Sequence, residues 1–407
     1  MIEKIRKEVL NRLDQTRELA DEEIWRCIDE VVVQFSKIEY LPLPKRSQVR
    51  KGVFDSLRRL DILQELLEDD EITEIMVNGC EDIFVERQGS IEKLDKHFIS
   101  QERLSDVIQL MVAKVNRRVN EASPIVDSRL EDGSRVNIVL NPVAINGPII
   151  TIRKFPKNPI TMEMLVLWET ISEEAAAMLK DMVAAGYNIM VCGGTGSGKT
   201  TFLNAMSDFI PKEERIITVE DSAELQIKGV ANLVKLETRN GTTEGEHSIS
   251  IRDLIRTSLR MRPDRIIVGE VRGEEAVDLL QSMNTGHDGA MSSGHSNSPL
   301  DMLRRLETMV LMGLDMPIQA IRGQITSALD IVIHLGRMRD KSRRVLEIAE
   351  VLPLKNNNYQ LNRIFWFEET AQKEGGVVGR LSGGRERLKN RQKLIMAGIN
   401  WETPGTA

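Results

Sequence analysis

Residues 193–200 read GGTGSGKT, between an apolar run at Asn188–Cys192 and a helical pattern at Thr200–Ser207. This is the P-loop pattern GxxxxGK[ST] in the strand–loop–helix context that it requires. Its glycines let backbone N–H groups point at phosphate oxygens, and the start of the helix adds positive potential. The stretch predicts a nucleotide site in which a lysine reaches the β- and γ-phosphates and a hydroxyl binds Mg²⁺. Its residues are Gly193, Gly194, Thr195, Gly196, Ser197, Gly198, Lys199, Thr200 and Thr201.

From Asn188 onward the sequence alternates apolar runs with helical patterns. Repeated βα units form a parallel sheet that helices cover on both faces. The predicted fold class is therefore α/β, with a P-loop NTPase core. The expected strands are Asn188–Cys192, Arg215–Glu220, Asn232–Leu236, Arg265–Gly269, Ala290–Gly294 and Asp330–Leu335.

Changes in this pattern divide the rest of the chain. Residues 1–48 are a helical extension, which either packs on the segment behind it or is a partner-binding arm. Residues 154–166 are a Pro-containing linker, 167–355 the NTPase domain, and 356–407 a C-terminal extension that begins with a loop at Asn356–Asn358 and continues as a polar tail. Residues 49–153 are a smaller α+β domain, with helices at Val53–Glu68 and Gln101–Val119 and strands at Glu74–Val77, Asp82–Glu86, Ser134–Leu140 and Pro148–Arg153.

The composition excludes several classes of protein. Lysine and arginine total 55 and aspartate and glutamate 62, so the net charge is −7, and aromatic residues make up 4%. A dedicated nucleic-acid binder would be basic, and a base-stacking platform would be richer in aromatic side chains. The scattered cysteines Cys27, Cys80 and Cys192 form no disulfide framework or metal pair. Without a membrane-spanning run or a signal peptide, we expect a cytoplasmic protein that reaches the membrane through partners.

Two predicted strands end in carboxylates. The segment RIITVEDSAEL places Glu220, Asp221 and Glu224 at a strand end, where they either hold Mg²⁺ and orient water or serve as caps and surface charges. The segment RIIVGE places Glu270 where it could polarise water for attack on the γ-phosphate. Gly269 stands where many NTPases have a metal-binding aspartate, which shifts that duty to Glu270.

A histidine stands near each end of the strand expected at Ala290–Gly294. They are His287 in NTGHDG and His295 in SSGHSN. Beside glycine, serine and asparagine, they are either a sensor that hydrogen-bonds the γ-phosphate or ordinary polar residues. Arg272, two residues after Glu270, is expected to share its end of the sheet.

The order GGTGSGKT, VEDSAEL, LRMRPDRIIVGEVRG, NTGHDG and GHSNS resembles the secretion ATPases of the type II/IV superfamily. The segments ITEIMVNG (72–79), IVDSRLEDGSRVN (125–137) and ITIRKF (150–155) extend the resemblance, which is closest to the CpaF-like branch of Tad/Flp pilus ATPases. The four-cysteine zinc module of other branches is absent, which favours that branch. The resemblance implies a homohexamer whose N-terminal domain is hinged to a RecA-like core, with ATP and Mg²⁺ bound and inner-membrane platform proteins as partners.

The resemblance also implies residue roles. Arg135 and Arg153 would close over the phosphates, and arginines of a core helix would neutralise the γ-phosphate charge unless each is a surface salt bridge. Those of the core helix are Arg252, Arg256 and Arg260. The implied catalytic residues are Glu270, Glu220, Lys199, His295, Arg135 and Arg153, and the implied metal-binding residues are Thr200, Glu220, Asp221 and Glu270.

One segment departs from the family pattern, and another matches the signature of a different family. Gly294 and Ser296 replace an aliphatic and a small residue, so looser packing of that strand is expected. The tetrapeptide LSGG at 381–384 matches the signature of ABC transporters, but it follows the Walker B strand, so we interpret it as accidental. It lies in a basic tail that is either solvated or touches acidic lipid or a membrane platform protein.

Two functions remain open from the sequence. The first is an ATP-hydrolysing motor for pilus assembly or protein secretion, peripheral to the inner membrane. The second is a RecA-like nucleic-acid translocase, against which the acidic balance weighs. Stimulation of turnover by DNA or RNA would distinguish them.

Overall fold

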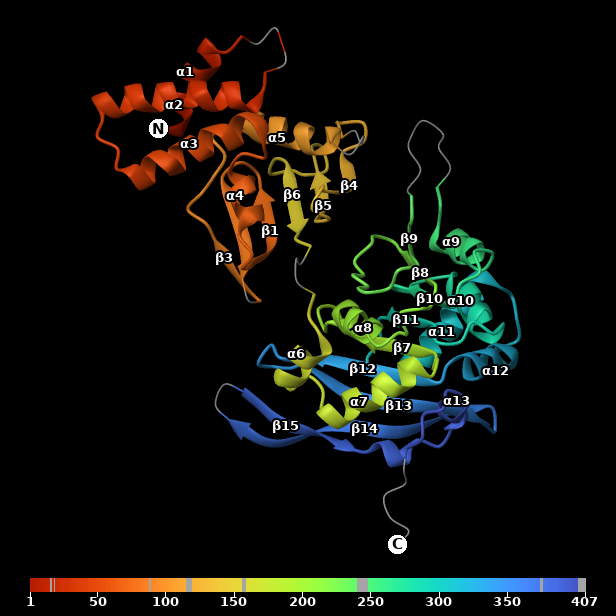
Figure 1. Cartoon of the computed structure of the whole chain (residues 1–407). Coiled ribbons are helices and arrows are strands. Elements are labelled where there is room, and N and C mark those ends of the chain that lie inside the picture. The colour runs from red at the N-terminus through yellow and green to blue at the C-terminus, as the bar shows by residue number, and fades with distance from the viewer. Residues whose placement is uncertain are drawn as a thin grey trace. The chain divides into compact units, whose positions relative to one another are not determined.

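The computed structural model describes residues 1–14, 17, 19–87, 89–114, 119–155, 159–239, 248–373 and 376–401. The chain forms two compact units, Met1–Lys157 and Asn158–Ala407 (Figure 1). Their division falls within the predicted linker, of which 156–158 lie outside the described residues and the last residues begin helix α6 (Met162–Leu167).

Three helices begin the first unit: α1 (Ile2–Arg12), α2 (Asp21–Ile38) and α3 (Leu43–Arg58). They share a core in which Trp25 stacks on Phe54 with ring centroids 3.9 Å apart. Because α3 runs through the predicted boundary at residue 48, the N-terminal helices pack on the segment behind them, which was the first of the two alternatives.

A six-stranded antiparallel sheet follows, in the order β3-β2-β1-β6-β5-β4. Helix α4 (Ile62–Glu68) is separate from α3, because Asp61 adopts a φ of 55° where the sequence predicted one continuous helix. Strand β3 was not predicted, since all four of its residues are exposed and give no apolar pattern. The strands are β1 (Ile72–Asn78), β2 (Asp82–Arg87), β3 (Ser90–Lys93), β4 (Ile125–Arg129), β5 (Arg135–Val139) and β6 (Ile149–Arg153), and helix α5 spans Gln101–Ala113.

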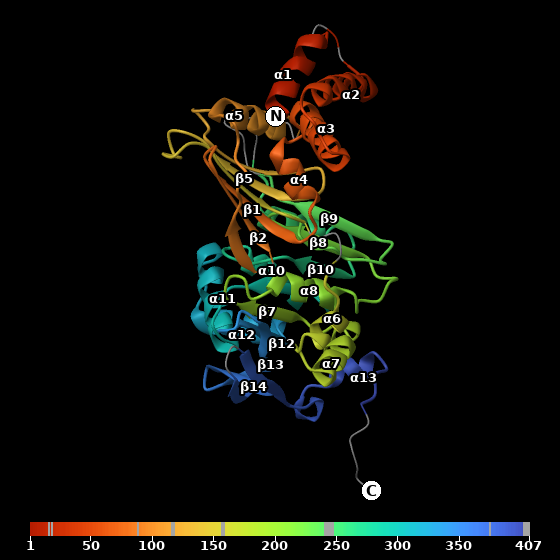
Figure 2. The same cartoon turned by 90° about the vertical axis from the view of Figure 1, so that its left-hand side faces the viewer.

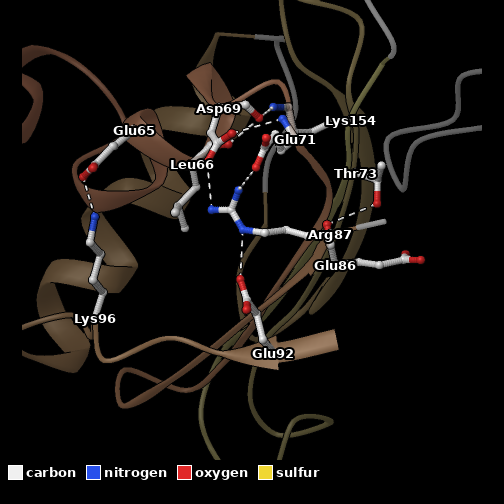
Figure 3. Close-up of polar contacts among 10 residues, drawn as sticks. All are labelled: Glu65, Leu66, Asp69, Glu71, Thr73, Glu86, Arg87, Glu92, Lys96 and Lys154. Atoms are coloured by element: carbon white, nitrogen blue, oxygen red, sulfur yellow. Dashed lines mark hydrogen bonds and ion pairs between the residues drawn. The ribbon is translucent and has the colours of Figure 1, made fainter. Parts of the chain in front are cut away.

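A polar network fixes the end of β6 to the α4–β1 turn (Figure 3). Lys154, the first residue after β6, donates to the carbonyl oxygens of Asp69 at 2.5 Å and Leu66 at 3.4 Å. Arg87, the last residue of β2, is paired with the carboxylate of Asp69 on that turn at 2.8 Å and with Glu92 at 2.9 Å. The chain therefore leaves the first unit from an anchored position.

The second unit is built on a nine-stranded sheet in the order β15-β14-β13-β12-β7-β11-β10-β8-β9. The six strands from β12 to β9 are parallel, as predicted, and the other three join antiparallel. The parallel strands are β7 (Ile189–Gly193), β8 (Ile216–Glu220), β9 (Leu233–Glu237), β10 (Arg265–Val268), β11 (Met291–Gly294) and β12 (Ile331–Arg337).

Helices cover both faces of this sheet (Figure 2). Along β7, Ile189 and Val191 enter one core while Met190 and Cys192 enter the other, which is the alternation of a strand buried on both sides. This is a RecA-like α/β core, accompanied by the smaller α+β unit. Among the described residues, no helix has the length and apolar character needed to cross a membrane. The helices are α7 (Glu173–Ala184), α8 (Lys199–Ser207), α9 (Ile251–Ser258), α10 (Ala276–Asn284), α11 (Pro299–Gly313), α12 (Ile318–Ala328) and α13 (Gln392–Met396).

The predicted polar tail beyond residue 355 was wrong over much of its length. β13 (Arg343–Lys355) and β14 (Asn358–Lys373) form a hairpin, and β15 (Gly376–Gly383) pairs with β14. The predicted loop is a two-residue turn in which Asn356 and Asn357 have φ values of 51° and 60°, the positive values that tight hairpins require.

The basic segment after β15 folds back onto the second unit. The guanidinium of Arg387 lies 5.0 Å from the Trp366 ring centroid, and Lys393 is paired with Asp288 and Asp330. Lys393 therefore serves internal ion pairs, whereas Arg385, Arg387 and Lys389 are exposed, as the interpretation of a solvated face predicts.

Candidate nucleotide site

The P-loop connects β7 to α8 in the predicted context. Gly193, Gly196 and Gly198 have φ values of 156°, 72° and 91°, which residues other than glycine rarely adopt. A Cβ on Gly193 would also collide with the carbonyl oxygen of Leu335 and come within 2.6 Å of Ser197 Oγ. The glycines are therefore required by the shape of the loop.

The other P-loop side chains occupy distinct positions. Ser197 is buried and donates to the carbonyl oxygen of Gly194 at 2.9 Å, which ties the loop to itself. Thr195 is exposed, while Thr200 and Thr201 lie half-buried in the first turn of α8. Thr200 thus stands at the helix N-terminus, where its hydroxyl was expected to bind Mg²⁺.

Lys199 is buried and is held by two contacts. Its Nζ donates to the carbonyl oxygen of Gly194 at 3.1 Å and lies 3.3 Å from His295 Nδ1. Burial lowers the pKa of this amine, and the charge of Glu270 opposes that effect. The lysine is therefore already enclosed at the loop where phosphates would bind.

Glu270 joins the same cluster. His295 Nε2 lies 3.0 Å from Glu270 Oε1, and Arg272 Nη2 donates to Glu270 Oε2 at 2.8 Å. Oε1 is nevertheless buried without a properly aligned hydrogen bond, so it can accept a bond from a water or metal-bound group. Burial and the neighbouring Lys199 charge lower the pKa of His295, which favours the neutral imidazole.

The two predicted histidines are not together. His295 follows β11 at its carboxyl end, where the P-loop follows parallel strand β7. His287 precedes β11, so it lies at the opposite end of the strand, where its ring contacts Thr285. Of the two, the structure brings only His295 to the nucleotide site.

Glu220 lies outside the Lys199–His295–Glu270 cluster. Its side chain is 3% exposed and accepts hydrogen bonds from the backbone N–H groups of Glu224 at 2.7 Å and Leu225 at 3.0 Å. Burial raises its pKa to about 7 despite those two donors. The carboxyl group therefore shapes the loop that carries Asp221 and Glu224, and of those two, Asp221 is exposed and Glu224 half-buried.

Neighbouring side chains explain why position 269 is a glycine and not the usual aspartate. A Cβ at this position would lie 2.9 Å from Glu220 Cγ and 3.3 Å from Glu220 Oε2. The buried glutamate thus occupies the space that an aspartate at 269 would need, and the departure from the usual Walker B pattern follows from it.

The strand with the unusual histidine motif is not loosely packed. A Cβ on Gly294 would lie 2.7 Å from the Cε of Met302, which is fully buried on α11. The expectation of looser packing was therefore wrong, because the methionine fills the space that glycine leaves. Ser296 is also buried and donates to the carbonyl oxygen of Ser298 at 3.0 Å.

The arginines of α9 are engaged with the next helix. Arg252 and Arg256 each bond to the buried carboxylate of Asp278 at 2.8 Å, and Arg252 also pairs with Glu274 at 2.7 Å. For Arg252 and Arg256, the structure therefore shows salt bridges, which was the second of the two alternatives. Arg260 is exposed two residues after the end of α9.

Arg135 and Arg153 belong to the first unit. They lie directly opposite each other on β5 and β6, and both are exposed. Each unit is described by itself, so their contact with phosphates stays a prediction.

The sequence did not predict that two arginines, Arg337 and Arg343, lie near the P-loop. Arg343 Nε donates to the carbonyl oxygen of Gly196 at 3.0 Å, and Arg337 faces Arg343 across the β12–β13 pair. Like charges directly opposite each other on a sheet are unfavourable unless an anion lies between them. No motif contains these residues, because Arg337 lies beyond the strand expected at 330–335 and Arg343 begins β13, which the sequence did not predict.

A cleft of about 440 Å³ opens beside the P-loop. One wall carries Arg304 and Arg305 of α11, which have no ion-pair partner in the described part of the chain, and the other carries Gly194 and Thr195. Arg305 is close enough to His295 to oppose its protonation. Asp301 also lines the cleft, so the two arginines leave its lining with a net positive charge of one, which suits phosphate.

The residues present fit a nucleotide-bound Mg²⁺. The carboxylate Oε1 of Glu270 is buried and lacks a hydrogen bond, and Thr200 begins α8. Within the described ranges there is no group of three or more His, Cys, Asp or Glu side chains that could enclose a metal by itself. Such an ion would therefore be held largely by phosphate oxygens and water.

Comparison with known proteins identifies the family. Residues 57–386 match the family described as type II/IV secretion system protein. A Mycobacterium tuberculosis protein whose name links it to conjugal transfer is 37% identical over 297 residues, covering 71% of this chain and 83% of the relative. Conjugal transfer protein TrbB of Rhizobium radiobacter is 32% identical over 312 residues, covering 76% of this chain and 93% of the relative.

Solved structures share the fold. The pilus retraction motor PilT with bound ADP superposes with a TM-score of 0.52 at 21% identity, covering 75% of this chain and 81% of PilT. The family match spans most of the sequence, including the P-loop and both carboxylate strands. The chain belongs to the type II/IV secretion system protein family.

Proposed function

We propose that this chain is a Mg²⁺-dependent ATPase, the homohexameric motor of a CpaF-like machine for Tad/Flp pilus assembly or protein secretion at the inner membrane. The observation that carries the ATPase proposal is the contact series Lys199–His295–Glu270 beside a complete P-loop. Family membership supports a role in a secretion or pilus machine. The N-terminal motifs that resemble the CpaF-like branch support the narrower assignment.

The proposed chemistry follows from these positions. The P-loop N–H groups and Lys199 bind the β- and γ-phosphates, which draws the lysine away from His295. Glu270 orients the attacking water and accepts its proton, while neutral His295 keeps an N–H available for a phosphate oxygen. Thr200 and Glu270 would hold Mg²⁺ together with the nucleotide, and the ion would supply positive charge to the phosphates. Arg135 and Arg153 are the predicted cationic contributors from the first unit.

The test is phosphate release measured over a range of protein concentrations. We expect wild-type turnover to rise with concentration, Lys199→Ala to lose nucleotide binding, and Glu270→Gln to bind ATP without hydrolysing it. Full activity of Glu270→Gln would overturn the role of that residue, and constant specific activity down to monomeric concentrations would overturn the ring. Stimulation by DNA or RNA would favour the translocase.

A matched pair of histidine variants sharpens the test. His295→Ala is expected to reduce turnover by about 10²-fold or more, as for other positioned polar groups at a reacting phosphate. His287→Ala removes the same side chain from the opposite end of β11 and should leave turnover unchanged. Equal losses of turnover in the two variants would mean that His295 acts only through folding, and unchanged turnover in both would mean that His295 has no part in the reaction.

A further inference from the structure

The connection between α2 and α3 exposes an unusual group of apolar side chains. Ile38, Tyr40 and Leu43 are 87%, 85% and 78% exposed within six residues. Single exposed apolar residues are normal, whereas a contiguous group marks a contact surface. Figure 1 shows this connection at the end of the helical pair that is remote from the sheet of the same unit.

The exposure is built into an ordered turn. Leu41, between the exposed residues, is only 2% exposed and anchors the connection in the protein. Arg46 Nε donates to the carbonyl oxygen of Leu41 at 2.8 Å, and the Arg46 N–H donates to that of Pro42 at 3.0 Å. The backbone that presents the apolar side chains is thus already ordered, which reduces the entropy cost of binding.

Positive charge accompanies the apolar group. Residues 37–46 contain Lys37, Lys45 and Arg46 against Glu39, a net charge of 3 − 1 = +2 in a chain whose total is −7. Lys37 and Lys45 are exposed and have no ion-pair partner among the residues that the structure describes. Aliphatic side chains, a tyrosine and flanking lysines are the combination found where proteins enter the headgroup region of anionic bilayers.

We propose that the α2–α3 connection, Lys37–Arg46, is a membrane-docking tip that inserts Ile38, Tyr40 and Leu43 into the interfacial layer of an anionic bilayer. A protein partner would need a groove for the same side chains, but it would not explain the flanking lysines as directly. The proposal does not depend on ATP hydrolysis, since the tip lies in the first unit. It gives the chain a direct contact with lipid in addition to any contact through partners.

The experiment is co-sedimentation of the full chain with phosphatidylcholine vesicles that contain or lack phosphatidylglycerol, at low and high salt. We expect binding to the anionic vesicles that weakens with salt. Ile38→Asp/Leu43→Asp should reduce the partition coefficient about tenfold or more, and Lys37→Gln/Lys45→Gln several-fold. The control is Ile145→Asp, because Ile145 is 91% exposed in a loop without charged neighbours.

The outcomes separate the proposal from its rivals. All substituted side chains are exposed, so thermal unfolding and phosphate release in the absence of vesicles should match wild type. Absence of wild-type binding to anionic vesicles, or binding that the Ile38/Leu43 variant retains, would overturn the proposal. A variant that abolishes activity in cells although wild type ignores vesicles would assign the tip to a protein partner instead.

Discussion

Replacing Glu220 with glutamine should remove a specific pH dependence from the stability of the second unit. The carboxyl group is 3% exposed at the end of β8, and burial raises its pKa to about 7 from 4.5. Between pH 4.5 and about 7, the carboxyl group of Glu220 is therefore protonated in the folded chain and ionised in the unfolded chain. Since a raised carboxyl pKa favours the protonated form in the folded state, the stabilisation is complete below pH 4.5 and is lost as the pH rises through 7.

The size of the effect follows from the two pKa values. Each pH unit between them corresponds to about 1.4 kcal/mol, so ionising Glu220 in the folded chain costs about 3 kcal/mol. Wild type should lose that much unfolding free energy from this group between about pH 5 and pH 8. Glu220→Gln keeps an acceptor for the N–H groups of residues 224 and 225 but cannot ionise, so its stability should change less over the same range.

The assay is denaturant unfolding at several pH values, with hydrogen exchange of the peptide covering 216–225 to assign the transition to the second unit. Glu213→Gln is the matched control, because it removes an exposed carboxyl before the same strand. A wild-type pH profile that Glu220→Gln reproduces would refute the reasoning, since Glu220 would then be ionised in the folded chain.

Three further predictions concern residues around the site. Gly269→Ala should lower the unfolding free energy by about 1–3 kcal/mol, because its Cβ would meet the Glu220 side chain at 2.9 Å, and Gly269→Ala/Glu220→Ala should recover part of that loss in denaturant unfolding. Arg343→Gln should raise the KM for ATP about tenfold with a smaller change in kcat, because it removes a charged donor from the P-loop; an unchanged KM in phosphate-release assays would show that Arg343 has no part in binding. Met302→Ala should cost about 2–5 kcal/mol through the cavity it leaves, and thermal unfolding should show Gly294→Ala/Met302→Ala to be more stable than Met302→Ala alone, because the added methyl group refills part of that cavity.

The parallel part of the second unit could be predicted from the sequence because both faces of its strands are buried. Runs such as Ile216–Glu220 are apolar throughout, and they stand out from the helices between them. β14 and β15 give a weaker signal, since they carry many partly buried and exposed polar residues. The pair Asn356–Asn357 was visible in the sequence, but it was interpreted as a loop, whereas positive φ values at both residues make it a hairpin turn.

The difference between parallel and antiparallel strands also explains which parts of the site could be predicted. Parallel strands bring their carboxyl ends to one edge, so the P-loop after β7, Glu270 after β10 and His295 after β11 converge although up to about a hundred residues separate them. Arg343 follows no such rule, because it reaches the P-loop from the start of an antiparallel strand whose register depends on long-range pairing. Glu220 also ends a parallel strand, yet its carboxyl group is turned onto its own loop by two backbone N–H groups. Position at the strand end therefore predicts which residues meet, whereas local hydrogen bonds decide which of them remain available to the phosphates.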